Sequence, residues 1–352
     1  MQFASDNRAG LAPEVLDAIA REAAHRGGGY GEDPTTAAVT VALADVFEHE
    51  VTVYPVLTGT AANAIALASL ADPWGAVVCE REAHIVVDEC GAPEFYGGGL
   101  RLVPIDGEHG KLTPAAVGDL LATPARGDVH ESPLQLLSLT NLTEFGTAYT
   151  AAETAELCTM AHDRGLRVHL DGARFANAVA GGAGTPAQLT WQAGVDVVIY
   201  GGSKNGALAA EAVVFFDPSL AATFERRRKR GGHLASKMRF VSAQLLAGLT
   251  DDRWLTWASH ANAMARRLRD GVGDLAGVDV VHAVDGNQIW LRTATDRAAA
   301  WAAAGAEFYD TTVGDLTTVR LVCDFSTTED EIDTFLAMIS TTARDMVTSE
   351  IP

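Results

Sequence analysis

The chain has 352 residues, which is enough for a large buried core and a second domain. It carries 26 Lys and Arg residues against 46 Asp and Glu residues, and this net charge of −20 argues against binding nucleic acid, which requires basic surface. The apolar runs are far too short to span a membrane, and the N-terminal residues lack a signal-peptide pattern. Four scattered cysteines without a CxxC pattern are typical of reduced thiols in a cytoplasmic protein, and we assign no metal site.

Helices and strands alternate over the first 250 residues, which predicts an α/β fold. In chain order the pattern predicts helices at 13–25 and 34–48, a strand at 51–57, a helix at 61–70, strands at 76–80 and 100–105, a helix at 113–123, a strand at 134–140, a helix at 151–163, and strands at 166–170, 195–199 and 211–216. Pro55 requires an edge or bulge position in its strand. Thr150 and Glu153 form the pattern of a capping box.

The last third of the chain predicts a second, smaller unit. A long amphipathic helix at 245–270 leads to strands at 278–284, 288–292 and 318–323, with helices at 296–304 and 329–348. We therefore expect an N-terminal arm and helix at 1–25, a large domain at 26–250, and a linker helix with a small α/β domain at 251–352.

Lys204 follows the predicted strand 195–199 across Gly201 and Gly202, which allow a sharp turn. Open α/β sheets hold their ligands at the carboxyl ends of strands, so a lysine here could meet a ligand. Shielded from water, its free amine could attack a carbonyl. Taken alone, however, a solvated surface lysine is the more common case.

Asp171 gives this lysine a possible partner. It follows the strand 166–170, where an acid is often only a turn or a helix cap. Its separation from Lys204, 204 − 171 = 33 residues, leaves room for one crossover helix between parallel strands, so both side chains could face one ligand. A Schiff-base lysine and an aspartate that holds a pyridinium nitrogen are the protein's part of pyridoxal phosphate chemistry.

Several ordered motifs extend this pattern along the chain. They are FASDN, YGEDPTT, TGTAANA, EAHIVVDECGAPEF, HLDGARFANA and GGSKNG. With them the sequence resembles the low-specificity threonine aldolases, in the β-eliminating lyase group of fold-type I pyridoxal phosphate enzymes, from Phe3 to about Ser340. The resemblance implies pyridoxal 5'-phosphate as cofactor and a mainly parallel, doubly wound sheet in the large domain.

The resemblance also implies roles around the cofactor ring. Lys204 would bond the cofactor, Asp171 would keep its pyridine nitrogen protonated, and Arg174 would steady the ring-oxygen side. His84, just after the strand 76–80, would stack on the ring and take the proton of the substrate hydroxyl. A structural or solvated histidine is the alternative.

The cofactor phosphate would lie at a strand–turn–helix segment. Gly59 and Thr60 would bind it through free N–H groups at the start of a helix, with Ser203 nearby. An ordinary turn with Thr60 as N-cap is the alternative. Lys237 or Arg228, in the basic segment 224–239, could reach the phosphate of a neighbouring subunit, although a solvated helix face would explain most of this segment.

Five residues would bind the substrate. Arg320 and Ser5 would hold its carboxylate together with Arg174, and Tyr30 would lie near a subunit boundary. Thr143 stands near the place where most of the family has a histidine, and it could hydrogen-bond a hydroxyl but not act as a base at pH 7. Ordinary explanations are a turn and cap for Ser5, loop surface for Tyr30 and an exposed strand position for Arg320.

The implied activity is cleavage of β-hydroxy-α-amino acids of the L-threonine, L-allo-threonine or phenylserine type to glycine and an aldehyde. It would occur in a homodimer or homotetramer with active sites at subunit interfaces. β-Elimination, racemisation or aminotransfer with the same cofactor would be compatible with the same residues, and a non-catalytic regulator is opposed by the intact set of site residues. A dehydrogenase is disfavoured because no GxGxxG follows the first strand.

Overall fold

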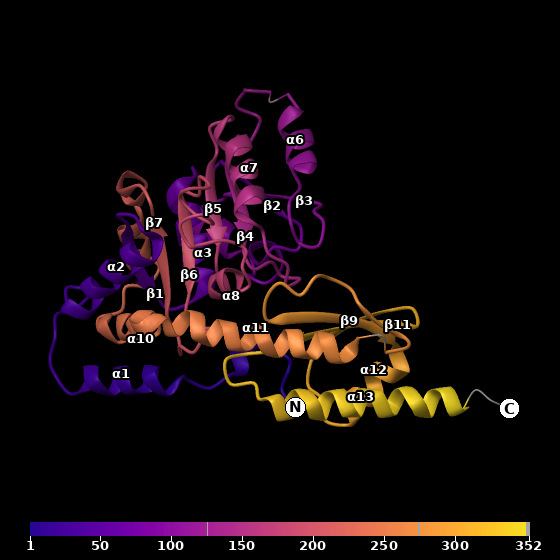
Figure 1. The fold of residues 1–352 in the computed structure, drawn as a ribbon. Coiled ribbons are helices and arrows are strands. Elements are labelled where there is room, and N and C mark those ends of the chain that lie inside the picture. The colour runs from indigo at the N-terminus through magenta and orange to yellow at the C-terminus, as the bar shows by residue number, and fades with distance from the viewer. Residues whose placement is uncertain (125, 274, 350–352) are drawn as a thin grey trace.

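The computed structural model describes residues 1–124, 126–273 and 275–349, and within them the chain forms two sheets (Figure 1). The large sheet has the strand order β1-β7-β6-β5-β4-β2-β3. Its strands are β1 (Thr52–Val56), β2 (Ala76–Glu80), β3 (Arg101–Ile105), β4 (Leu134–Thr140), β5 (Arg167–Asp171), β6 (Val197–Gly201) and β7 (Glu211–Phe215). Strands β3, β2, β4, β5 and β6 pair in parallel, whereas β7 pairs antiparallel with β6 and β1, so the predicted mainly parallel sheet is confirmed.

Helices cover both faces of this sheet, because alternate side chains of its central strands are apolar on both sides. Val198 and Val214 pack into a core with α2, α7 and α10, whereas Val197 and Ile199 pack against α3 and α9. The helices of this part are α1 (Pro13–Ala23), α2 (Pro34–Phe47), α3 (Gly59–Leu70), α4 (His84–Val87), α5 (Ala92–Gly97), α6 (Pro114–Ala122), α7 (Ala151–His162), α8 (Phe175–Ala180), α9 (Phe224–Arg230) and α10 (Arg239–Leu249).

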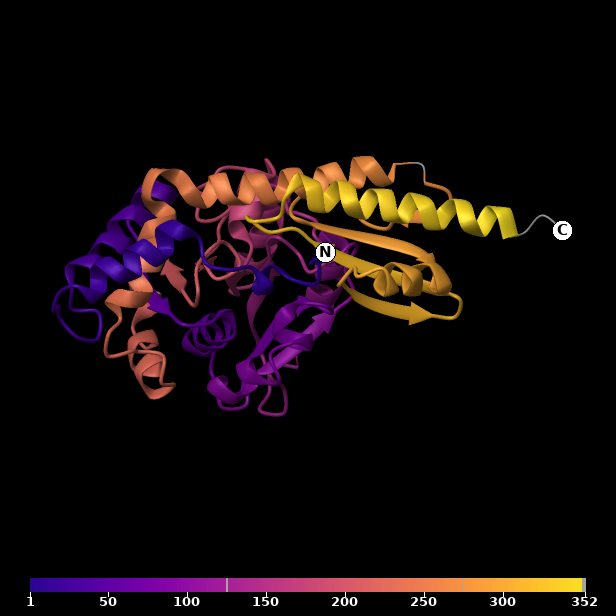
Figure 2. The same ribbon diagram turned by 90° about the horizontal axis from the view of Figure 1, so that it is seen from below.

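The small sheet is antiparallel, in the order β10-β11-β9-β8. Its strands are β8 (Val278–Val280), β9 (Gln288–Ala294), β10 (Tyr309–Val313) and β11 (Leu316–Val322), and its helices are α11 (Arg253–Val272), α12 (Thr295–Ala303) and α13 (Glu329–Ser349). Helices α11 and α13 lie side by side along this sheet (Figures 1 and 2). The N-terminal arm joins the same unit, because Phe3 donates to Glu307 O, accepts from Val322 N and packs its ring on Phe335.

Local sequence signals agree with several of these elements. Pro55 lies on β1, the edge strand of the large sheet, as the missing N–H donor requires. The capping box of Thr150 and Glu153 is present at the start of α7. Ser5 caps a short 3₁₀ helix at Asp6–Arg8 by accepting the Asn7 N–H, which confirms the turn-and-cap interpretation of this segment.

Three local expectations were wrong. The long helix at 245–270 is two helices, because Asp251 and Asp252 adopt left-handed backbone conformations between α10 and α11. Strand β10 was not predicted, since all five of its residues are exposed and no apolar alternation marks it. Helix α3 begins at Gly59 with Thr58, not Thr60, as its N-cap. The crossover between the parallel strands β5 and β6 contains one helix, the six-residue α8, which agrees with the spacing of Asp171 and Lys204.

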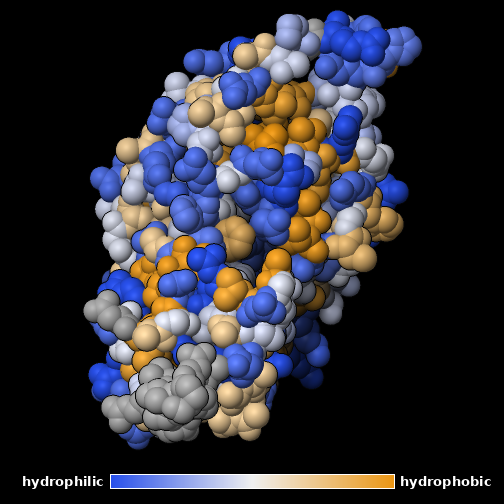
Figure 3. Space-filling model, turned by 90° about the vertical axis from the view of Figure 1, so that its right-hand side faces the viewer, coloured by the Kyte–Doolittle hydropathy of each residue, from blue (hydrophilic) through white to orange (hydrophobic). Residues whose placement is uncertain are grey.

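No helix among the described residues has both the length and the apolar character needed to cross a membrane. All four cysteines are free thiols; Cys90 is exposed and the others are buried. On the face shown in Figure 3, hydrophilic residues cover much of the surface and hydrophobic residues gather in separate patches.

Candidate active site

The carboxyl ends of β5 and β6 lie side by side at one edge of the large sheet. Asp171 is the last residue of β5, and Lys204 follows the end of β6 by three residues. Gly201 is needed between them for close packing, because a Cβ at this position would lie 2.4 Å from the Ala173 carbonyl oxygen. Absence of a side chain therefore lets the Lys204 loop approach the segment that follows Asp171.

A cavity of about 330 Å³ opens at this edge and is lined by most of the predicted cofactor residues. Its lining includes Gly59, Thr60, His84, Asp171, Ser203 and Lys204. Gly59 and Thr60 are the first two residues of α3, so their N–H groups have no acceptor within the helix. The Ala61 N–H is bound instead by the Thr58 hydroxyl at 3.2 Å.

These groups fit pyridoxal phosphate. The start of a twelve-residue helix presents free N–H groups and the positive end of its dipole to a phosphate. Asp171 is only 3% exposed and provides a buried carboxylate for the ring nitrogen, while Lys204 provides an amine for the aldehyde carbon. An anion site, a buried acid and an amine thus share one cavity.

Glu211, which sequence reasoning placed only in a strand, supports the Lys204 loop. Its carboxylate is buried and accepts the Gly202 N–H at 2.9 Å. Ser203 accepts the Ala210 N–H with its hydroxyl at 3.1 Å, so this side chain braces the same loop. Burial raises the pKa of Glu211 to about 7, against the opposing hydrogen bonds from Ser203 and Gly202.

A chain of hydrogen bonds connects Asp171 with His84. The Asn63 amide nitrogen donates to Asp171 Oδ2 and to Glu89 Oε1, each at 2.8 Å. Glu89 Oε1 also lies 2.9 Å from His84 Nδ1, and the Glu89 side chain has no exposed surface. With Glu89 ionised, His84 Nδ1 donates and Nε2 is the ring nitrogen left for other partners. Neither Asn63 nor Glu89 was among the site residues predicted from the sequence.

The pKa values of His84 and Glu89 are both raised. The hydrogen bond to Glu89 raises the pKa of His84 above 6.5, outweighing the effect of burial. Burial raises the pKa of Glu89 above 4.5, although His84 and Asn63 donate to it. Because both pKa values are raised, His84 and Glu89 together hold one proton, which lies in the hydrogen bond between them. The fully buried Glu89 carboxylate therefore orients the half-buried His84 imidazole.

A second cavity of about 400 Å³ adjoins the first and shares His84 and Lys204 with it. The predicted substrate residues Ser5, Arg174 and Arg320 line this cavity. Side chains that the sequence did not single out complete its wall: Asn7, Asp88, Glu144, Trp290, Tyr309, Asp310 and Thr311.

The two arginines of this cavity differ in their partners. Arg174 is 4% exposed and forms a two-pronged ion pair with Asp6, with distances of 2.7 and 2.9 Å. Asn287 also donates to Asp6, at 3.1 Å. Burial alone would raise the pKa of Asp6, but the Arg174 charge and these hydrogen bonds hold it below 3.8. The importance of Asp6 was missed because its partner is 168 residues away in the chain.

Arg320 is the other cation. Its Nη2 donates to the Ala4 carbonyl at 3.3 Å and its guanidinium lies 5.1 Å from the centre of the Tyr309 ring. Across the described parts of the chain, no carboxylate lies within ion-pair distance of Arg320, and its buried Nε has no acceptor. Burial and the nearby Arg174 charge lower its pKa, so this cation would gain from an anion in the cavity.

Two predicted residues do not reach these cavities for packing reasons. Thr143 is fully buried, and its hydroxyl is shared with Thr147 at 2.8 Å; the next residue, Glu144, faces the cavity instead. Arg228 is buried within the fold of the single chain, where it donates to Pro55 O at 3.0 Å and lies over the Tyr54 ring. The hydroxyl role for Thr143 and the intersubunit role for Arg228 are therefore corrected.

Tyr30 and Lys237 lie close together in the chain's fold, and neither lines the two adjoining cavities. The Tyr30 N–H donates to Ser236 O at 3.0 Å, and Lys229 Nζ lies 4.3 Å from the centre of the Tyr30 ring. Tyr30 is 51% exposed, and Lys237 is exposed as well. Neither side chain lines a cavity that contains Lys204.

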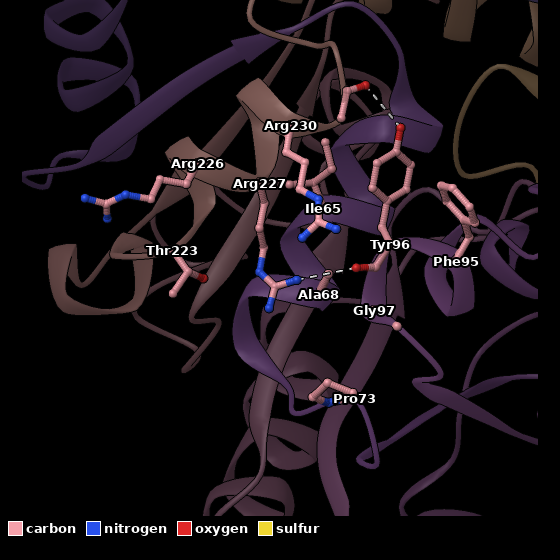
Figure 4. Close-up of a pocket in the computed structure, with 12 residues that line it drawn as sticks. Ile65, Ala68, Pro73, Phe95, Tyr96, Gly97, Thr223, Arg226, Arg227 and Arg230 are labelled. Carbon is pink, nitrogen blue, oxygen red and sulfur yellow. Dashed lines mark hydrogen bonds between the residues drawn. The ribbon is translucent and has the colours of Figure 1, made fainter.

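A larger cavity of about 760 Å³ lies elsewhere, between α3, α5 and α9 (Figure 4). Arg226, Arg227 and Arg230 of α9 line it together with Tyr96, whose hydroxyl donates to Gly231 O at 3.3 Å. Since it contains none of the predicted site residues, we assign the chemistry to the two smaller, adjoining cavities.

Comparisons with known proteins agree with this fold and cofactor site. The β-eliminating lyase family matches residues 2–295. The low-specificity L-threonine aldolase of Pseudomonas aeruginosa is 41% identical over 326 residues, 93% of each chain. A threonine aldolase structure from Leishmania major superposes with a TM-score of 0.91 at 25% identity, covering 97% of this chain and 99% of that one. A serine palmitoyltransferase from S. paucimobilis with bound pyridoxal phosphate shares the fold, with a TM-score of 0.72 at 16% identity over 99% of this chain and 88% of that one.

The fold and the site therefore define a fold-type I pyridoxal phosphate enzyme with the chemistry of a lyase. More closely, the chain belongs to the β-eliminating lyase family and is similar to its low-specificity L-threonine aldolases.

Proposed function

We propose that this enzyme cleaves β-hydroxy-α-amino acids such as L-threonine into glycine and an aldehyde. The observation that carries this proposal is the place of His84, which lies where the cofactor cavity and the arginine-lined cavity meet. A base at this junction is suited to a substrate hydroxyl next to the cofactor ring. When bound, pyridoxal phosphate supplies the electron sink that a broken Cα–Cβ bond requires.

Arg320 and Ser5 hold the substrate carboxylate in this proposal. Arg320 has no acid partner of its own, whereas the charge of Arg174 is already balanced by Asp6. A planar guanidinium binds a carboxylate through two parallel hydrogen bonds and so fixes its orientation. Arg174 adds a positive wall that its ion pair with Asp6 keeps in place.

His84 takes the proton of the substrate β-hydroxyl through Nε2, since Glu89 occupies Nδ1. Lys204 bonds the cofactor, and Asp171 keeps the ring nitrogen protonated from its buried position. Asn63 holds both Asp171 and Glu89, so the acid that serves the cofactor and the acid that orients the base move together.

The test is a product assay on the purified holoenzyme. With L-threonine we expect equimolar acetaldehyde and glycine, and a Lys204→Ala variant should lose turnover together with the visible absorbance of the bound cofactor. Release of ammonia and a keto acid would instead indicate β-elimination. Conversion to the D-isomer would indicate racemisation, and a keto acid formed without ammonia would indicate aminotransfer. Full activity in Lys204→Ala would refute the mechanism.

We also propose that two or four copies assemble with active sites shared between subunits. Tyr30 and Lys237 are suited to a partner's site because they lie together, exposed, and away from the cavities of their own subunit. Leu208 lines the cofactor cavity and is 66% exposed, so a partner that packs against this opening would remove apolar surface from water.

Mixing two inactive variants tests this assembly. Lys204→Ala and Lys237→Ala subunits, refolded together, should form mixed oligomers in which one site has both lysines from different chains. Activity should then reappear, and light scattering should show a dimer or tetramer. Inactive mixed oligomers, or a monomer with full activity, would contradict the shared site.

Two further expectations stay proposals. We propose a cytoplasmic location, which the four free thiols support. We also propose a division into an arm and helix at 1–25, a large domain at 26–250, and a linker helix with a small domain at 251–352, which the two separate sheets support.

A further inference from the structure

Glu144 occupies a rigid position in the wall of the substrate cavity. It follows Thr143 in a tight turn closed by a hydrogen bond from Gly146 N to Thr143 O at 3.0 Å. Thr143 and Thr147 fasten this turn through their backbone and hydroxyl groups, and the Phe145 ring stacks on His282 at 4.6 Å. The half-buried Glu144 side chain is thus presented to the cavity by a fixed backbone.

No structural partner accounts for this carboxylate. Within the described ranges, Glu144 makes no hydrogen bond or ion pair, although it lines the same cavity as Arg174 and Arg320. Its charge acts on His84, Arg174 and Arg320, all of which touch the cavity. An unpaired, half-buried acid beside the substrate can therefore influence which substrates bind.

The balance of charge in the cavity gives the sign of this influence. Its cations are Arg174, Lys204 and Arg320, and its acids are Asp88, Glu144 and Asp310. In the proposed function, Lys204 bonds the cofactor, Arg320 takes the α-carboxylate, and Arg174 is neutralised by Asp6. None of these three cations is then free to bind a second anionic group of the substrate, whereas the three acids would repel it.

Among these acids, Glu144 should have the strongest effect. Asp88 and Asp310 are exposed, so water and salt screen their charges. Glu144 is half-buried, and charges interact more strongly where the effective dielectric constant is lower.

We propose that Glu144 selects substrates by charge, so that the enzyme accepts β-hydroxy-α-amino acids with a neutral or cationic β-substituent and rejects those with an anionic one. This inference rests on the proposed aldol cleavage, since it concerns the substituent that leaves as the aldehyde. It assigns a specificity role to a side chain adjacent to the position where the sequence had suggested Thr143.

The experiment compares kcat/KM for L-threonine, 3-hydroxyaspartate and 3-hydroxylysine, whose β-substituents are neutral, anionic and cationic. In Glu144→Gln, the hydroxyaspartate-to-threonine ratio should rise about tenfold and the hydroxylysine-to-threonine ratio should fall about threefold. Glu144→Asp keeps the charge and should retain the wild-type ratios. Asp310→Asn is the matched control, and because this acid is exposed both ratios should change less than about twofold.

In Glu144→Gln the hydroxyaspartate-to-threonine ratio should rise while the hydroxylysine-to-threonine ratio falls. A purely structural role of Glu144 would instead change kcat/KM for all three substrates alike and leave both ratios unchanged. Ratios within about twofold of wild type in Glu144→Gln, or two ratios that move together, would overturn the proposal.

A measurement on the wild-type holoenzyme needs no variant. Spectral titration of the bound cofactor should give an L-asparagine affinity at least about tenfold higher than that of the equally sized, anionic L-aspartate. Equal affinities would overturn the charge selection. If the enzyme yields ammonia and a keto acid rather than an aldehyde, the proposed function fails, while this titration still decides whether the cavity excludes a second anion.

Discussion

Replacing Asp6 with asparagine removes one charge from a fully enclosed ion pair. The side chains of Asp6 and Arg174 are 0% and 4% exposed, and their two hydrogen bonds are 2.7 and 2.9 Å long. Breaking a buried pair from one side costs about 3 to 5 kcal/mol, because the other charge stays buried without a partner. The pair also connects the N-terminal arm to the segment that follows β5, so its loss should lower the global stability of the protein.

This free energy converts into a melting-temperature shift. At about 2.1 cal/mol/K per residue, the unfolding entropy is about 0.74 kcal/mol/K for 352 residues. Asp6→Asn should therefore lower the Tm of the holoenzyme by about 4 to 7 °C at pH 7. Glu307→Gln is the matched control, because Glu307 pairs with Arg8 of the same arm but both side chains are about half exposed. Its Tm should fall by only about 1 °C.

The pH dependence of the difference provides a second check. The folded state holds the pKa of Asp6 below its ordinary value of 3.8, so the stability it contributes is present above that pH and is lost as the pH falls through the folded pKa. The Tm gap between wild type and Asp6→Asn should therefore narrow below about pH 4. A Tm of Asp6→Asn within about 1 °C of wild type at pH 7 would refute the reasoning.

Three further predictions concern the site itself. His84→Asn should lower kcat/KM for L-threonine by about 100-fold or more while the cofactor absorbance is retained. Glu89→Gln should move the acid limb of the pH–kcat/KM profile to lower pH, because a neutral amide oxygen accepts a weaker hydrogen bond from His84 than the carboxylate whose bond raises the pKa of His84. An unmoved limb would refute this coupling. As the pH rises from 5 to 8, the free energy of unfolding of Glu211→Gln should increase relative to that of wild type by on the order of 3 kcal/mol. The reason is that Glu211 is buried with a folded pKa of about 7, so its ionisation destabilises the native state of the wild type. Parallel Tm curves over this pH range would contradict this. Arg320→Lys should raise KM for L-threonine about tenfold or more with a smaller effect on kcat, since a lysine cannot bind a carboxylate in a two-pronged way, and an unchanged KM would assign the carboxylate to another group.

The sheet and the cofactor cavity could be predicted because their signals are local. Strands β2 and β4 appear as apolar runs with the bounds that the structure shows. Asp171 at the end of β5 and Lys204 just after β6 come together because the carboxyl ends of parallel strands lie side by side. The break between α10 and α11 gave no such signal, because its two aspartates with positive φ interrupt a segment whose apolar periodicity continues on both sides.

The substrate cavity was harder to predict because its contacts are not local. Asp6 directly follows Ser5 in the segment explained as a turn and cap, and only the folded chain shows that it pairs with Arg174. The choice between Thr143 and Glu144 depends on which side chain of one tight turn faces the cavity, and sequence spacing does not give that direction. The order of the sequence motifs thus predicted which segment lines the substrate cavity, but not that Glu144 rather than Thr143 faces it.

The hydrogen bonds of Asn63 explain why the carboxylates of Asp171 and Glu89 can be buried close together. Two carboxylates near each other repel, and the amide nitrogen of Asn63 offsets this by donating one hydrogen to each. Glu89 receives a second donor from His84, and Asp171 receives the Ala173 N–H at 2.9 Å. Each acid is thereby held in one orientation, and since both bonds come from one side chain of α3, a shift of that helix displaces the His84 base and the Asp171 contact together.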